Sequence, residues 1–194
     1  MAYTISPQLE ALTRKMQHEI IAIASQRGLL AGELYIVDEL TAKWKTSAPE
    51  YMADAVPEIK DYPTVAIAWA CYYGMGAAAM WDIAWDEAKG IKDLYVYMRS
   101  KRGFDAMDEY IMEELMLLNE NSENTEIAEN AKKLTSTIQD FAALALTMIR
   151  KEGLEAQSAQ AFYMFAEVVK LFFSVGVSLE LFRRGYKYHK MEIN

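Results

Sequence analysis

Apolar side chains recur every three to four residues along most of the chain, a spacing typical of amphipathic helices rather than of strands. The first such stretch follows Ser6 and Pro7, residue types favoured at a helix N-cap and at the first helical position. One face of this stretch is apolar at Leu9, Leu12, Met16, Ile20 and Ile23. The pattern predicts an opening helix that ends before Gly28.

Residues 64–81 contain no charged side chain and follow Pro63, which suits the first turn of a helix. At helical spacing, one side of this stretch carries the small-residue seam Ala66, Ala70, Gly74 and Ala77, followed by Trp81 and Ala84. Gly74 and Gly76 each cost about 1 kcal/mol in a helix interior relative to Ala. We therefore expect a central apolar helix over about residues 63–88, in which a close neighbouring backbone or a kink accounts for the glycines.

The same spacing predicts further helices at several places along the chain, namely over residues 30–45, 92–101, 104–118, 124–151 and 156–186. Pro49 and Pro57 punctuate residues 47–62, where we expect a connection that holds a short helix. The last helix is apolar nearly all round, apart from the polar stripe Tyr163, Glu167, Lys170, Ser174 and Ser178. These elements predict an all-α fold: a single domain over residues 1–194, built as a bundle of seven to eight helices around the central one.

Composition supports one sizeable core, since 53% of the 194 residues are hydrophobic. The opening residues lack the apolar stretch of a secretory signal, so we expect a cytoplasmic protein. A single cysteine, Cys71, excludes an internal disulfide framework. We expect no membrane span, because residues 64–81 are mostly Ala, Gly and Tyr, and the last helix carries Glu167 and Lys170 in its middle.

The net charge of −8 comes from one segment. Between Arg102 and Lys132 there is no basic residue, but there are nine acids: Asp105, Asp108, Glu109, Glu113, Glu114, Glu120, Glu123, Glu126 and Glu129. The rest of the chain is nearly neutral, so nucleic acid is not an expected partner. On an α-helix, Met112 and Met116 would lie on the acidic side, where exposed methionines suit an adaptable surface for a basic or amphipathic partner. The alternative is that another helix covers them.

Four carboxylates lie at positions where a negative charge is unfavourable without a partner. Asp82 and Asp86 are four residues apart, so they repel each other and require a cation. Glu33 and Glu180 lie on helix faces that the pattern predicts to be buried, where a lone carboxylate pairs, binds a metal or becomes protonated. Local explanations exist, because Lys89 follows Asp86 and Arg184 follows Glu180 by one turn.

A metal site is the alternative explanation for the four carboxylates. Glu33, Asp82, Asp86 and Glu180 come from three predicted helices and could surround Mg²⁺ or Mn²⁺, which take oxygen ligands. A histidine-containing di-iron site is not supported, because neither His18 nor His189 completes a Glu-x-x-His motif. The chain also lacks the sequence motifs of serine hydrolases, phosphate-binding loops and dinucleotide-binding folds.

The functional prediction is a non-enzymatic module that binds a partner protein or a small apolar ligand, and that can self-associate through an apolar helix face. Candidate binding residues are Trp81, Trp85, Met112 and Met116, although aromatic residues at helical spacing also commonly fill cores. No cofactor is predicted for this function. The alternative is a phosphoester or nucleotide hydrolase that uses Mg²⁺ or Mn²⁺ held by Asp82 and Asp86 with Glu33 or Glu180.

Overall fold

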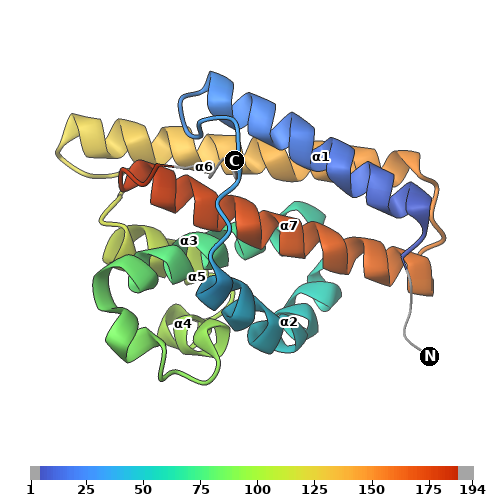
Figure 1. Ribbon diagram of the computed structural model, residues 1–194, viewed down its shortest axis with the longest axis horizontal. Helices are drawn as coiled ribbons and strands as arrows, with labels where there is room; N and C mark the ends of the chain where they lie inside the picture. Colours follow the sequence, from blue (N-terminus) through green and yellow to red (C-terminus); the bar gives the residue numbers. More distant parts are fainter. Residues whose placement is uncertain (1–4, 188–194) are drawn as a thin grey trace, which may run out of the picture.

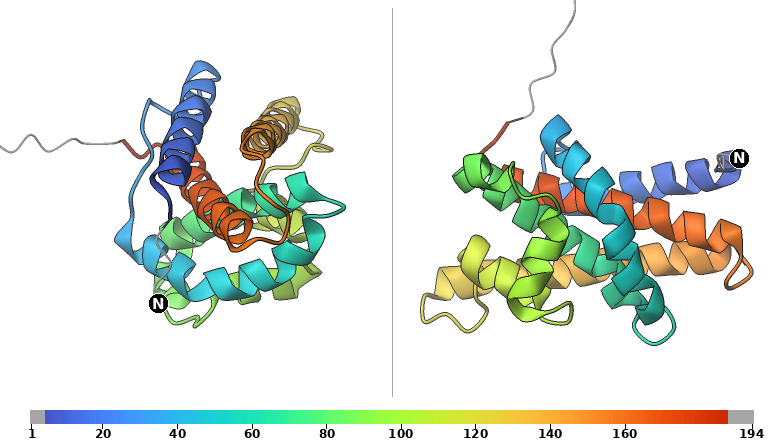
Figure 2. Two further views of the ribbon diagram at one scale, coloured as in Figure 1. Left: turned by 90° about the vertical axis from the view of Figure 1, so that its right-hand side faces the viewer. Right: turned by 90° about the horizontal axis from the view of Figure 1, so that it is seen from below.

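The computed structural model describes residues 5–187, which form seven α-helices and one π-helical segment. Helix α3 (Pro63–Ala88) lies at the centre, and α7 (Ala159–Arg183) packs along it more extensively than any other two elements pack together. Helices α1 (Pro7–Gln26) and α6 (Thr125–Lys151) lie on one side of this pair, and α2 (Asp38–Glu58) and α4 (Leu94–Arg102) lie on the other (Figures 1 and 2). The predicted all-α arrangement around a central apolar helix is confirmed.

The α3–α7 contact is close because each helix places a glycine at the crossing. A Cβ atom at Gly74 would overlap the carbonyl oxygen of Phe173, and one at Gly176 would overlap that of Cys71. The two backbones therefore touch directly, which only glycine allows. Gly74 belongs to the small-residue seam predicted for α3 and contacts the backbone of α7. Gly176 is the corresponding glycine of α7.

Helix α1 follows its prediction closely. The Ser6 hydroxyl accepts a hydrogen bond from the backbone N–H of Leu9 at 3.3 Å, and Pro7 occupies the first turn. The predicted helices over residues 92–101, 124–151 and 156–186 correspond to α4, α6 and α7 within a few residues. Side-chain caps begin these three helices as well, at Asp93, Asn124 and Ser158.

The helix predicted over residues 30–45 is wrong in its first half. Residues 28–37, here named the strap, turn and bend as far as residue 33, run extended over residues 34–37 across α7, and lead into α2, which begins only at Asp38 (Figure 1). Gly28 and Gly32 adopt positive φ angles of 71° and 87°, which a helix does not permit. The predicted connection over residues 47–62 is mostly helix, because α2 continues through Pro49 and buries Ser47, Tyr51 and Ala55. Tertiary burial thus outweighs the helix-breaking tendency of proline.

The segment predicted as one α-helix over residues 104–118 divides into α5 (Met107–Tyr110) and a π-helical turn, η1 (Ile111–Leu115). The N–H of Met116 donates to the carbonyl of Ile111, an i to i+5 bond that closes the wider turn. Met112 and Met116 lie in the core, where they are 7% and 3% exposed. The prediction of an exposed acidic surface at these two methionines is therefore wrong, and the alternative that they are covered is confirmed.

Helix α7 is, among the described residues, the one helix long and apolar enough to cross a membrane. Within its most apolar window, 67% of the residues are buried inside the bundle. Its apolar surface is therefore largely covered by α3, α2 and α1.

Candidate functional site

The C-terminal end of α3 bends at Ala84, whose φ and ψ of −146° and 44° are not helical. Before the bend, Asp82 accepts hydrogen bonds from the Tyr186 hydroxyl and from Nη1 of Arg184, the latter at 3.0 Å. These two donors hold the pKa of the Asp82 carboxyl below its ordinary value. The ring of Trp81 packs against Tyr186 at a centroid distance of 5.7 Å. Asp82 therefore ties α3 to the residues that follow α7.

Glu180 is, within residues 5–187, the only charged side chain that is fully buried. Its carboxylate accepts from Nε and Nη2 of Arg183 at 2.7 and 2.8 Å and from Nε of Arg184 at 2.6 Å. The predicted ion pair between Glu180 and Arg184 is confirmed. The two arginines also donate to the carbonyls of Met116 and Leu115 at 3.2 and 3.4 Å. Glu180 thus positions the two arginines that link the end of η1 to α7.

The predicted ring of carboxylates does not form. Asp82 and Glu180 share Arg184, but Asp86 lies beyond the bend, with a side chain that is 94% exposed and paired to Lys89. Glu33 lies on the strap and is exposed, because the helix predicted to bury it is absent there. Across the described chain, no three His, Cys, Asp or Glu side chains gather in a way that could hold a metal ion. The proposed hydrolase therefore has no geometric support.

Trp81 and Trp85 are half-buried against side chains of the same chain. The Lys43 ammonium lies 5.8 Å from the centre of the Trp85 ring. It also donates to the carbonyls of Lys89 and Ile91, at 3.1 and 2.6 Å. Both tryptophans consequently pack the bent end of α3 against its neighbours.

Part of the acidic segment surrounds a hollow of about 300 Å³ next to η1. Its walls include Asp108, Glu109 and Glu113, with the buried Tyr72 beside them. Burial raises the pKa of Asp108, and the negative charge of Glu109 adds to this effect. Arg102 does not line the hollow, but it donates to both Glu113 and Glu114 at 2.9 Å. Its positive charge offsets part of the negative charge of the acidic segment.

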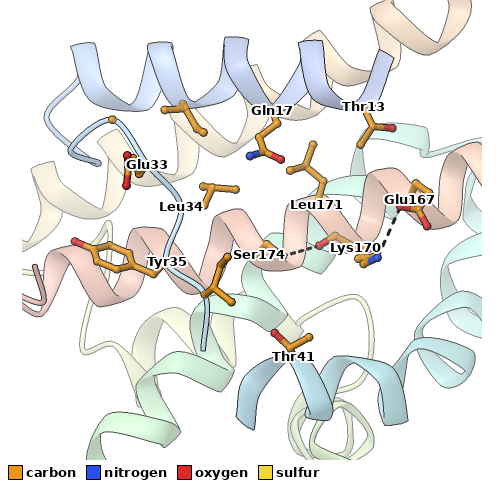
Figure 3. Close-up of a pocket in the computed structure, with 13 residues that line it drawn as sticks. Thr13, Gln17, Glu33, Leu34, Tyr35, Thr41, Glu167, Lys170, Leu171 and Ser174 are labelled. Atoms are coloured by element: carbon orange, nitrogen blue, oxygen red, sulfur yellow. Dashed lines mark hydrogen bonds and ion pairs between the residues drawn. The ribbon is translucent and has the colours of Figure 1, made fainter. Parts of the chain in front are cut away.

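A second hollow, of about 520 Å³, lies between α1, α7 and the strap (Figure 3). Most of the predicted polar stripe of α7 lines it, at Glu167, Lys170 and Ser174. Leu34 of the strap and Leu171 of α7 add apolar surface. The hollow is amphipathic and carries charges of both signs. We name it the strap hollow.

The third feature is the α2–α7 groove, an open hollow of about 700 Å³ between the two helices. One of its lining residues is charged and the others are apolar: Lys45, Ala48, Pro49, Met52, Ala53, Val56, Pro57, Phe162 and Ala166. Phe162 is 47% exposed and Val56 is 38% exposed. Large apolar side chains in a concave surface are typical of binding sites rather than of ordinary protein surface.

Two prolines of α2, Pro49 and Pro57, line the α2–α7 groove. Neither proline has an N–H to donate to the carbonyl four residues earlier, which belongs to Lys45 for Pro49 and to Ala53 for Pro57.

Sequence reasoning did not identify Met52, Val56 or Phe162 as binding candidates. The sequence pattern predicts that the helix containing Phe162 is covered on most of its circumference, and it predicts a connection over residues 47–62. If the chain is taken to be helical through Pro49, helical spacing places four of the groove residues along one stripe: Lys45, Pro49, Met52 and Val56. Their exposure depends on where α7 lies.

No protein-family model, no curated protein and no solved structure matches this chain.

Proposed function

We propose that the protein is a non-enzymatic binding module that holds an amphipathic helix of a partner protein in the α2–α7 groove. The observation that supports this function is the exposure of Phe162 and Val56 beside Met52 in a groove with a single charged residue. Leaving such side chains in water costs free energy that a bound apolar surface recovers, at about 25 cal/mol per Å² buried.

The shape of the groove favours a helix as the ligand. Its α2 wall extends from Lys45 to Pro57, which is about 18 Å at 1.5 Å per residue. Three turns of an amphipathic helix have that length, with apolar anchors every three or four residues. A small apolar ligand would occupy the same surface around Phe162.

The test uses the fluorescent apolar probe 1-anilinonaphthalene-8-sulfonate. We expect the native protein to bind it with increased fluorescence, and we expect Phe162→Asp to reduce that binding because a carboxylate is unfavourable in an apolar groove. Ile83→Asp is the matched control, since Ile83 is 65% exposed on α3 and does not line the groove. Equal probe binding by native protein and Phe162→Asp, with both proteins folded, would contradict the proposal.

A second measurement identifies the partner. A photo-reactive phenylalanine analogue at position 162 is expected to cross-link one protein in cells, whereas the same analogue at position 83 is not. Circular dichroism of the isolated partner segment, with and without the module, then measures whether the segment becomes helical on binding.

A further inference from the structure

Residues 34–37 of the strap are extended, and one backbone edge of this part is unpaired within residues 5–187. Neither the N–H nor the carbonyl group of Leu34 or Ile36 makes a hydrogen bond with another part of residues 5–187. Tyr35 between them is fixed, because its N–H donates to the Ser178 hydroxyl of α7 at 2.8 Å and its own hydroxyl donates to the carbonyl of Tyr186 at 2.6 Å. The strap is thus held rigidly at one residue and unpaired at the residues on either side.

The direction of the unpaired edge follows from strand geometry. Along an extended chain, backbone N–H and carbonyl groups point alternately to opposite edges. Since the N–H of Tyr35 points toward α7, those of Leu34 and Ile36 point away from α7. Their side chains line the strap hollow, and that of Ile36 is 82% exposed. Figure 3 shows Leu34 directed into the hollow, between Gln17 of α1 and Ser174 of α7.

We propose that an extended segment of a partner polypeptide pairs with the outer edge of the strap and adds a second strand to it. The two donors and two acceptors of Leu34 and Ile36 alternate along that edge, and another extended backbone is the ligand whose acceptors and donors match them. Every second side chain of the bound segment lies over Ile36 and the strap hollow. Unpaired strand edges are known sites of such association.

The surroundings favour a peptide over other ligands. The strap hollow contains Glu33 and Glu167 as well as Lys170, so it does not select a strongly anionic ligand. Lys170 lies 3.9 Å from Glu167, a loose pair in which Lys170 is 56% exposed. A hydrocarbon chain would leave the backbone groups of Leu34 and Ile36 unpaired. This site shares no lining residue with the α2–α7 groove, so it is independent of the function proposed above.

The test begins with selection of binders to the full chain from a phage-displayed library of random heptapeptides. The strongest binder is synthesised in two N-methylated forms, one methylated at the odd residues and the other at the even residues. Because only alternate residues face a paired strand, we expect one form to lose binding and the other to retain it. Isothermal titration calorimetry measures both affinities.

Variants of the strap test the protein side of the same contact. Ile36→Pro removes the N–H of Ile36, whereas Ile36→Ala keeps it and shortens the side chain. We expect Ile36→Pro to weaken peptide binding about five- to tenfold more than Ile36→Ala does, the effect of one lost hydrogen bond. Phe162→Asp, in the α2–α7 groove, is expected to leave peptide binding unchanged.

Three results would overturn the proposal: no heptapeptide is selected, both N-methylated forms bind equally, or binding depends on Phe162. The N-methylated peptides decide the question even if Ile36→Pro fails to fold, because they leave the protein unaltered.

Discussion

Substitution of Gly74 by alanine tests the close crossing of α3 and α7. In an uncrowded helix interior this change would stabilise the protein by about 1 kcal/mol, because alanine has the higher helix propensity. Here the added Cβ would overlap the carbonyl oxygen of Phe173 and would lie 3.0 Å from the backbone nitrogen of Val177. Backbone atoms of a packed helix cannot rotate away, so the helices must separate.

Gly76, in the same helix, is the matched control. A Cβ atom there would lie 2.8 Å from Sδ of Met98 and 3.0 Å from Cγ1 of Ile111. These are side-chain atoms, and methionine in particular adapts easily to a new neighbour. Gly76→Ala therefore combines the same gain in propensity with a smaller steric cost.

Overpacking of a core typically costs about 1–3 kcal/mol, occasionally more. We expect Gly74→Ala to lose about 2 kcal/mol after the propensity gain is subtracted, and Gly76→Ala to stay within about 1 kcal/mol of the native protein. In a domain of this size, a 2 kcal/mol loss lowers Tm by roughly 4–8 °C. Urea denaturation followed by circular dichroism measures both variants. A Gly74→Ala protein as stable as Gly76→Ala would refute the backbone contact at Phe173.

Two further predictions concern the ion pairs at the end of α7. Glu180→Ala leaves Arg183 and Arg184 without their buried partner, so we expect a loss of about 3 kcal/mol in urea denaturation; a loss below about 1 kcal/mol, similar to that of the exposed control Glu87→Ala, would contradict this role. Asp82→Asn should destabilise the protein more at pH 7 than near pH 3. Because the pKa of Asp82 is lowered in the folded state, its contribution is complete above the unfolded-state value of about 3.9 and disappears as pH falls through the lower folded-state value. Urea midpoints of both proteins at the two pH values measure this change, and an unchanged difference would argue against it.

Local pattern determines most helices of this chain. Ser6 and Pro7 start α1 as their residue types predict, and the uncharged stretch after Pro63 becomes the central helix. The ion pair of Glu180 with Arg184 was also predictable, because a helix brings residues four apart onto the same side. Each of these features depends on residues close together in the sequence.

The predictions from local pattern are wrong where tertiary contacts change the local conformation. Apolar residues at Leu30, Leu34 and Val37 fit a helical spacing, yet the strap is not helical: Gly32 has a positive φ angle, and the N–H of Tyr35 donates to Ser178 of α7. The prediction that Glu33 lies on a buried helix face is wrong for this reason. Helical spacing alone cannot distinguish an apolar residue packed in a helix from one packed in an extended segment.

The sequence by itself determined that the protein is helical, which stretches are apolar and which carboxylates need partners, because periodicity and charge spacing are local properties. Only the tertiary structure decided where those surfaces lie. The bend at Ala84 separates Asp86 from Asp82, and Met112 is buried although α-helical spacing places it on the acidic side. The position of α7 beside α2 leaves Phe162 exposed in a groove. Exposure depends on which distant helix packs alongside, and a one-dimensional pattern does not contain that information.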